Sequence, residues 1–225
     1  MFLGKKTIRR PFIVAVEGNV GSGKSTMLRY FKSKGEVRIY PEPVDSWRNV
    51  GGENLLNNLY KDPQRCSFTF QSYVQLTRLK ILEDVSTEGG VKIIERSIQS
   101  NDFVFLKTAQ KRGTLSDVEL QVLDSYHSWI RNSTITNPID LIVYLRTTPE
   151  VAHARLCKRA RSEEKTVPLD YLQDLHDSYE DWLMRKVYGQ PPAPVLVIDA
   201  NQSLSMVEKS LSLNSDTIMG NRKVV

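Results

Sequence analysis

The sequence predicts an α/β fold, in which helices cover both faces of a parallel β-sheet. Five short runs of apolar and β-branched residues are separated by longer helical stretches, and a glycine-rich loop directly follows the first run. Strands buried on both faces are apolar throughout, and strands that alternate with helices form βαβ units. The predicted strands are residues 12–16, 37–40, 91–94, 141–145 and 195–198.

Seven stretches between these runs are predicted to be helical. Pro149 and Pro168 suit the first turn of a helix, where a backbone N–H would have no partner. Ser116 followed by Glu119 matches a capping box, in which the two residues satisfy each other's backbone donors. The predicted helices are residues 24–34, 54–60, 64–84, 97–111, 116–132, 149–161 and 168–186.

The length and composition indicate one globular domain. The chain has 225 residues, of which 40% are hydrophobic and 25% charged, as in ordinary globular proteins. We expect a domain over residues 11–200, a basic arm over residues 1–10, and a partly disordered C-terminal tail over residues 201–225 with a helical turn or two. No apolar run approaches the 18 residues of a membrane-spanning helix, so we expect no membrane partner.

The net charge of +5 lies in the ends of the chain. The arm holds Lys5, Lys6, Arg9 and Arg10 without an acid, and the tail adds one net positive charge, which leaves residues 11–200 neutral. A nucleic-acid-binding domain would carry a basic stripe on its body, so we expect no nucleic-acid partner. The arm faintly resembles a transit peptide, but it is short and lacks Ser, which favours a cytoplasmic over a mitochondrial location.

The glycine-rich loop predicts a phosphate-binding site. Residues 18–25 match G-x-x-x-x-G-K-[ST] at every position, between a predicted strand and a predicted helix. Glycines allow backbone N–H groups to surround an anion, Lys24 adds a charge at the β- and γ-phosphates, and Ser25 can bind Mg²⁺. The residues predicted to hold the donor here are Gly18, Asn19, Val20, Gly21, Ser22, Gly23, Lys24, Ser25 and Thr26.

Charged side chains follow two of the strands that should lie near this loop. Glu42 stands between two prolines after the second strand, and Glu95 and Arg96 end the third. Ligands of open α/β sheets bind at the carboxyl ends of the strands, which is where these groups are expected. A solvated turn is the plainer interpretation of Glu42. The GTPase motif N-K-x-D and an Asp of Walker B type are missing from the sequence.

A basic segment after the fourth strand predicts a lid. Residues 155–165 carry five positive charges, and Arg155 and Arg159 share a face at helical spacing. Such a charge run is often only a solvated surface. In a protein with a phosphate-binding loop, however, arginines here can close on the phosphate that is transferred.

Six motifs in order resemble the deoxyribonucleoside kinase family. They are EGNVGSGKS, PEPVDSWRNV, FQSYVQLTRL, ERSIQS, LIVYLRTTPE and RARSEE, and the resemblance covers about residues 11–200. It is nearest to the branch of the broad-specificity insect enzyme and mitochondrial thymidine kinase. It implies a P-loop kinase fold with five parallel strands in the order 2-3-1-4-5, helices on both faces, and an arginine-rich lid. It also implies a homodimer formed by the long helices 64–84 and 116–132.

The implied activity is transfer of the γ-phosphate of ATP, with Mg²⁺, to the 5′-hydroxyl of deoxyribonucleosides in nucleotide salvage. By this resemblance Glu42 is the general base, Arg96 orients it, and Glu95 and Ser25 bind the metal. Lys24, Arg159 and Arg161 would act on the transferred phosphate. The other implied donor contacts are Arg155, Asp199 and Asn201.

The same resemblance implies a nucleoside pocket. Tyr60 and Glu164 match positions that hold the sugar 3′-hydroxyl, and Gln71 matches the amide that binds the base edge. Trp47 and Phe105 match its aromatic walls. The remaining implied pocket residues are Val74, Arg78 and Asn101.

The pocket departs from the family pattern at Arg78. The thymidine kinase branch usually has Met here, whereas the deoxycytidine and deoxyguanosine kinase branch has Arg paired with an Asp at the position of Asn101. We therefore expect broad specificity, with pyrimidine and some purine deoxynucleosides as substrates. The alternative is that Arg78 forms a structural ion pair with Asp102 or Glu42.

Two other functions remain open on the sequence. A nucleoside monophosphate kinase would need a cationic site for the acceptor phosphate near residues 47–49, where only Arg48 is present. A non-catalytic relative, like the accessory subunit of respiratory complex I, could lose Lys24 or Glu42, but this chain retains both.

Overall fold

A five-stranded parallel sheet forms the centre of the molecule in the computed structural model, which describes residues 10–35, 37–84, 90–133 and 139–222. The predicted strand order β2-β3-β1-β4-β5 is confirmed. Phe12 of β1 pairs with Val91 of β3, and Val14 pairs with Leu141 of β4. The strands are β1 (Phe12–Glu17), β2 (Val37–Tyr40), β3 (Val91–Glu95), β4 (Leu141–Arg146) and β5 (Val195–Asp199).

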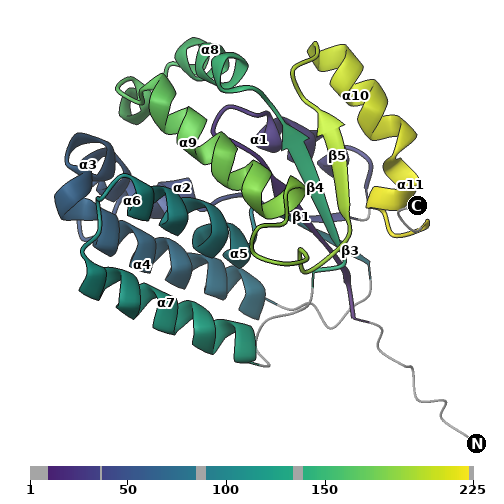
Figure 1. Cartoon of the computed structure of the whole chain (residues 1–225). Coiled ribbons are helices and arrows are strands. Elements are labelled where there is room, and N and C mark those ends of the chain that lie inside the picture. Colours follow the sequence, from purple (N-terminus) through teal and green to yellow (C-terminus); the bar gives the residue numbers. More distant parts are fainter. Residues whose placement is uncertain (1–9, 36, 85–89, 134–138, 223–225) are drawn as a thin grey trace, which may run out of the picture.

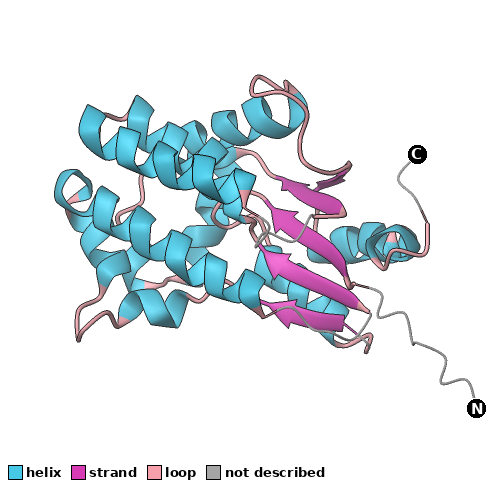
Figure 2. Ribbon diagram, turned by 90° about the horizontal axis from the view of Figure 1, so that it is seen from below, coloured by secondary structure: helices cyan, strands magenta, loops and turns pink. Residues whose placement is uncertain are grey.

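Helices cover both faces of the sheet (Figures 1 and 2). Successive residues of a strand point to opposite faces, so Ile13 and Ala15 join one core cluster while Val14 and Val16 join the other. The first cluster lies under α4 (Pro63–Glu83), α7 (Asp117–Asn132), α8 (Pro149–Arg159) and α9 (Leu169–Tyr179). The second lies under α1 (Lys24–Lys32), α10 (Leu204–Leu213) and α11 (Ser215–Ile218).

Two of the predicted long helices contain π-helical turns. The predicted helix 97–111 is α5 (Ile98–Ser100), η1 (Asn101–Leu106) and α6 (Lys107–Lys111), and η1 is a π-helix. The second π-helix, η3 (Glu180–Met184), continues α9. Such turns are frequent at functional sites because they shift side chains relative to an α-helix. The remaining short helices are α2 (Val44–Arg48), α3 (Leu55–Lys61) and η2 (Ser162–Glu164).

The C-terminal segment contains more helix than we expected. We predicted a helical turn or two after residue 200, but α10 alone has 10 residues and α11 follows it. Leu211 and Ile218 are 1% and 0% exposed and belong to the core under α1. These helices cover apolar sheet surface that would otherwise face water, which explains why a Ser- and Asn-rich segment is ordered there. Residues 223–225 and most of the basic arm lie outside the described residues.

Candidate active site

The glycine-rich loop joins β1 to α1 in a conformation that requires glycine. Gly18, Gly21 and Gly23 have φ values of 143°, 82° and 100°, which residues with a β-carbon rarely adopt. A β-carbon on Gly21 would lie 2.5 Å from the carbonyl oxygen of Ala152. Asn19 secures the loop, since its amide donates to Leu172 O at 2.8 Å and its Oδ1 accepts from Val20 N.

The loop fits a polyphosphate. The Lys24 ammonium is 5% exposed and donates to Gly18 O at 3.0 Å and Asn19 O at 2.7 Å. Burial, with a smaller contribution from the charge of Arg96, lowers the pKa of Lys24 to about 7. The buried hydroxyl of Ser22 has no hydrogen-bond partner among the described residues. An anion in the loop would accept from such a hydroxyl and would favour the charged form of Lys24.

Ser25 and Glu95 meet beside the loop. The Ser25 hydroxyl donates to Glu95 Oε1 at 3.1 Å, and Glu95 ends β3 with 8% of its surface exposed. Within the described ranges no cluster of three or more His, Cys, Asp or Glu residues could hold a metal ion. Mg²⁺ usually takes one or two protein ligands together with water and phosphate oxygens. One carboxylate and one hydroxyl next to a phosphate loop therefore fit Mg²⁺.

Glu42 lies between two arginines. Its Oε2 accepts from Arg96 Nη1 at 2.5 Å, and its Oε1 accepts from Arg78 Nη2 at 2.9 Å. Burial favours the neutral acid, but the charges of Arg96, Arg78 and Lys24 outweigh it and lower the pKa of Glu42 to about 2. Glu42 is therefore ionised at neutral pH.

The backbone and side chain of Arg96 are both held in place. Arg96 has a φ of 61°, and its N–H donates to Val16 O at 2.9 Å. Its Nη2 donates to Gly18 O at 3.3 Å, and its guanidinium lies 4.9 Å from the centre of the Phe105 ring. Arg96 thus contacts the carboxylate of Glu42, the phosphate loop and the wall of the neighbouring cavity.

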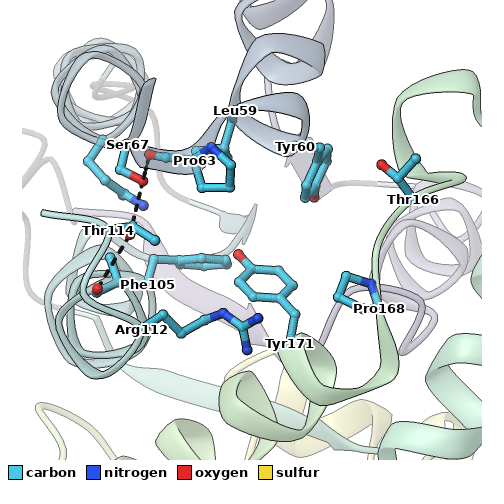
Figure 3. A pocket seen from close by; sticks show the side chains of 12 residues that line it. Leu59, Tyr60, Pro63, Ser67, Phe105, Arg112, Thr114, Thr166, Pro168 and Tyr171 are labelled. Carbon is cyan, nitrogen blue, oxygen red and sulfur yellow. Dashed lines mark hydrogen bonds between the residues drawn. The ribbon is translucent and has the colours of Figure 1, made fainter. Parts of the chain in front are cut away.

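Two adjoining cavities lie beyond Glu42. One of about 60 Å³ is bordered by Glu42, Arg96 and Arg161. A larger one of about 230 Å³ adjoins it (Figure 3), and Tyr60, Phe105 and Tyr171 line both cavities. Every residue predicted for the nucleoside pocket borders the smaller cavity: Trp47, Tyr60, Gln71, Val74, Arg78, Asn101, Phe105 and Glu164.

The Gln71 side chain suits recognition of a base edge. It is 7% exposed, lines both cavities, and its amide bonds to no other described residue. A buried amide needs partners for its donors and its acceptor, which a planar heterocycle can supply. Trp47 is oriented by a hydrogen bond from its Nε1 to Thr77 Oγ1 at 3.0 Å and by an edge contact with Phe70.

The lid arginines bond to a lid carboxylate. Arg159 Nη2 donates to Glu164 Oε1 at 2.6 Å, its Nε donates to Glu164 Oε2 at 3.1 Å, and Arg161 Nη1 lies 3.4 Å from Oε1. All three residues border a cavity of about 430 Å³ that Lys24 and Glu42 also line. Arg159 and Arg161 thus border the same cavity as Lys24 of the glycine-rich loop.

Arg155 lies apart from the other lid arginines. Its guanidinium donates to Ala200 O at 2.7 Å and Gln202 O at 3.1 Å, and it borders a cavity of about 220 Å³ with Gly23 and Thr26. Asp199 Oδ1 accepts from Asn201 N at 3.0 Å, while Asn201 Oδ1 accepts from Thr148 N. Arg155 is therefore next to the 199–202 loop rather than among the phosphate-facing arginines.

Arg78 forms the ion pair that the sequence left open as an alternative, and its partner is Glu42 rather than Asp102. Arg78 Nη1 donates to Ser97 O, Ser100 Oγ and Asn101 Oδ1, while Asp102 pairs with Arg131. Arg78 nevertheless borders the smaller cavity. Its guanidinium thus shapes the cavity and also bonds the carboxylate of Glu42.

Sequence reasoning missed three residues of the site: Glu17, Tyr171 and Tyr179. Tyr171 and Tyr179 are eight positions apart and so lie near one face of α9; Tyr171 lines both cavities and Tyr179 bonds Arg96. Glu17 ends β1 just before the glycine-rich loop. Two features of the sequence could have pointed to these residues, namely the position of Glu17 at the end of a predicted strand and the spacing of the two tyrosines on one predicted helix.

In the described ranges, no helix is both long and apolar enough to span a bilayer.

Comparisons with known proteins match most of the chain. A family model described as deoxynucleoside kinase matches residues 14–218, which include α10 and α11. The human protein named thymidine kinase 2, mitochondrial, is 41% identical over 211 residues, covering 92% of this chain and 77% of the relative. The protein of that name from Macaca fascicularis is 40% identical over 215 residues, covering 94% and 80%. Human deoxycytidine kinase is 32% identical over 232 residues, covering 87% and 88%.

The family match spans most of the described domain, and the alignments cover 77–88% of the length of these relatives. Together with the glycine-rich loop, Glu42 and the lid, this shows that the chain belongs to the deoxynucleoside kinase family and is an enzyme of that class.

Proposed function

We propose that this kinase transfers the γ-phosphate of ATP to the 5′-hydroxyl of deoxyribonucleosides, with thymidine and deoxycytidine among its acceptors and some activity on purine deoxynucleosides. One observation carries the proposal: Glu42 borders both the cavity of the phosphate loop and the smaller cavity lined by Gln71. A hydroxyl that reaches Glu42 from the second cavity would face the phosphate in the first.

Glu42 would accept the proton of the 5′-hydroxyl. A carboxylate with a pKa of about 2 is a weak base, but phosphoryl transfer passes through a loose transition state and depends mainly on positioning and charge stabilisation. Glu42 would therefore orient the hydroxyl and take its proton late in the transfer. Arg96 would hold that carboxylate and stabilise the developing charge.

The donor would lie on the glycine-rich loop. Lys24 would contact the β- and γ-phosphates, with Arg159 and Arg161 closing from the lid. Ser25 and Glu95 would hold Mg²⁺, which neutralises phosphate charge when bound. Arg155 and Gln202 border the cavity of about 220 Å³ beside Gly23, a position suited to the base of the donor. Asp199 and Asn201 belong to the same loop as Gln202 but do not line this cavity.

The acceptor would lie between Trp47 and Phe105, with its base on Gln71. An amide can donate and accept at once, so it can bond to more than one base edge. Val74, Arg78 and Asn101 would face the far side of the base, while Tyr60 and Glu164 would hold the sugar. The relatives bear the names thymidine kinase 2 and deoxycytidine kinase, which supports acceptance of both pyrimidines.

A nucleoside monophosphate would be a poor acceptor. Arg48 is the cation near residues 47–49, and its guanidinium bonds Glu163 at 2.8 Å and Asp45 at 3.2 Å. A second phosphate would have to displace Glu163, whose pKa is lowered to about 2 mainly by its hydrogen bond with Arg48.

The test is transfer of radiolabelled phosphate from ATP to thymidine, deoxycytidine, deoxyadenosine and deoxyguanosine in parallel, with thymidine monophosphate as a fifth acceptor. We expect labelled monophosphates from both pyrimidines, weaker labelling of purines, and no labelled diphosphate. Labelling of thymidine monophosphate alone would refute the proposal. Omission of Mg²⁺ should abolish transfer in every arm.

We also propose a homodimer formed through α4 and α7. Both helices carry exposed apolar side chains, namely Leu76, Val118, Tyr126 and Trp129. Exposed apolar groups gathered on neighbouring helices mark interaction surfaces, and α4 and α7 lie side by side (Figures 1 and 2).

For the compartment, the two thymidine kinase 2 relatives are named mitochondrial, which favours the mitochondrial alternative over the cytoplasmic location expected from the arm. A fusion of residues 1–40 to a fluorescent protein would show mitochondrial fluorescence under this alternative and diffuse fluorescence otherwise.

A further inference from the structure

A buried polar cluster lies behind Arg96, on the side away from Glu42. It consists of Glu17, Ser97 and Tyr179, which are 0%, 1% and 0% exposed. None of them borders the cavities assigned to the donor and the acceptor. Burying three polar side chains costs free energy unless their hydrogen bonds are satisfied, so the arrangement of these bonds is informative.

In the hydrogen bonds of the cluster, Glu17 is the final acceptor. Glu17 Oε1 accepts from Ser97 N at 2.7 Å and Ser97 Oγ at 2.6 Å. Arg96 Nε donates to the Tyr179 hydroxyl at 3.2 Å, and that hydroxyl lies 3.2 Å from Glu17 Oε2. A guanidinium only donates, so the phenol accepts from Arg96 and its own proton goes to Glu17. Burial raises the pKa of Glu17, and the hydrogen bonds from Ser97 oppose this rise.

The cluster holds Arg96 both through its backbone and through its side chain. Its backbone has the left-handed φ of 61°, which persists in a residue with a β-carbon only where the surroundings impose it. The bond from Ser97 N to Glu17 fixes the peptide that follows Arg96. The Tyr179 hydroxyl fixes the Nε edge of the guanidinium, whose Nη1 bonds Glu42 at 2.5 Å.

We propose that Tyr179 and Glu17 are positioning residues that orient the guanidinium of Arg96 and, through it, the carboxylate of Glu42 for phosphoryl transfer. This inference rests on the roles proposed above for Arg96 and Glu42. Tyr179 is the last residue of α9, directly before the π-helical turn of η3, and the same helix carries Tyr171 to the cavities. Without the phenol oxygen, Arg96 Nε is a buried donor without a partner, and rotation that satisfies it would move Nη1 away from Glu42.

The decisive variant is Tyr179→Phe, with Tyr144→Phe as its matched control. Tyr144 is 1% exposed, its ring stacks on Tyr179 at 5.7 Å, and its hydroxyl donates to Glu180 Oε1 at 3.0 Å rather than to an active-site residue. Each variant loses one buried hydroxyl from the same stacked pair. The measurements are steady-state kcat, KM for thymidine, and thermal unfolding of each full-length chain.

We expect Tyr179→Phe to lower kcat by about tenfold or more, because small misplacements of catalytic groups are costly. Its KM for thymidine should stay within about threefold, since Tyr179 does not border the cavities. Tyr144→Phe should keep kcat within about twofold of the parent, and its shift in Tm should be similar to that of Tyr179→Phe. Equal losses of kcat in the two variants, or a Tyr179→Phe enzyme with the parental kcat, would overturn the inference.

Two further variants test the route of the effect. Glu17→Gln should also lower kcat more than it raises KM, because an amide cannot accept both from Ser97 and from the phenol in the same way; parental kcat in this variant contradicts the proposal. Lysine has no counterpart of Nε, so in an Arg96→Lys background Tyr179→Phe should cause less than about threefold further loss, while a full further loss would show that Tyr179 does not act through Arg96. An inactive parent enzyme would refute the proposed function itself. An active parent enzyme whose kcat is unchanged in Tyr179→Phe would refute only this inference and leave the proposed function intact.

Discussion

Glu42 has both carboxylate oxygens bonded to arginines, so an acceptor hydroxyl must share or replace one of these bonds. Arg96 is anchored by Gly18 and Tyr179, and Arg78 by Ser97, Ser100 and Asn101. Neither guanidinium can swing far without losing several hydrogen bonds. The carboxylate is therefore preorganised and ionised before any substrate arrives.

Glu42→Gln should retain nucleoside binding and lose turnover. The amide keeps the size of the side chain but cannot take a proton, and loss of a general base typically costs about 10²–10⁴ in rate. We would measure kcat by phosphate transfer and the Kd for thymidine by calorimetry without ATP. Asp45→Asn, which alters a highly exposed carboxyl nearby, is the control. Turnover of Glu42→Gln within threefold of the parent would exclude Glu42 as the base.

Arg78→Met should shift specificity towards thymidine. The substitution removes a cation and its donors from the wall of the smaller cavity and leaves Arg96 to hold Glu42. A purine or cytosine group that bonds Arg78 would lose about 1.5–3 kcal/mol. We therefore expect kcat/KM for thymidine relative to deoxyguanosine and deoxyadenosine to rise about tenfold.

The ratio within one preparation cancels general losses of activity. Lys80→Met, an exposed cation on the same helix, should leave the ratio unchanged. If Arg78→Met leaves it unchanged as well, Arg78 serves only the ion pair with Glu42.

Lys24 should take up a proton when an anion binds the loop. Its pKa is lowered to about 7, and a bound anion favours the charged form, so affinity should fall as the pH rises above 7. Sulfate is a suitable probe because it does not titrate between pH 6 and 9. Calorimetry in two buffers with different heats of ionisation should reveal uptake near pH 8, and Lys24→Met should abolish it. A parent chain that binds sulfate without proton uptake would contradict this prediction.

At the scale of the elements, the lid contains its own counter-charge. Glu164 is 4% exposed and bonds both Arg159 and Arg161, so a phosphate must compete with it for the guanidinium groups. The adjacent Glu163 links the lid to α2 and α3 through Arg48 and Asn54. A movement of this segment would therefore break or shift its bonds to the helices that border the acceptor cavity.

Arg159→Ala should act mainly on the transfer step. An arginine that acts on the transition state is worth about 10³ or more in kcat, whereas nucleoside binding without ATP should change little. Arg155→Ala is the contrasting variant, because Arg155 bonds the 199–202 loop and should raise the KM for ATP instead. A large loss of nucleoside affinity with intact kcat in Arg159→Ala would remove Arg159 from the lid role.

At the scale of the whole molecule, the exposed apolar groups of α4 and α7 predict self-association. Trp129 is 58% exposed on α7, and a charge there should oppose burial of that surface. By sedimentation we expect the parent chain to be a dimer and Trp129→Glu to shift towards the 25.7 kDa monomer. Leu213→Glu, at a 77% exposed site on α10 across the sheet, should remain dimeric. A monomeric parent chain would refute the proposed interface.

The sequence by itself determined the sheet, the glycine-rich loop and the placement of Glu42, Glu95 and Arg96 at one edge. Each of these depends on local pattern: apolar runs define the strands, and parallel strands bring their carboxyl ends together. The C-terminal helices were underestimated, because their few apolar residues become decisive only against the exposed face of the sheet.

Only the tertiary structure decided which partners the charged groups take. Arg78 could reach several acceptors, and the packing of α4 beside α5 and η1 selects Glu42, Ser97 and Asn101. Tyr179 and Glu17 are 162 positions apart, and no periodicity relates residues at such a separation. Their contact arises because the last residue of α9 lies against the last residue of β1, and it places a buried hydroxyl on the arginine that holds Glu42.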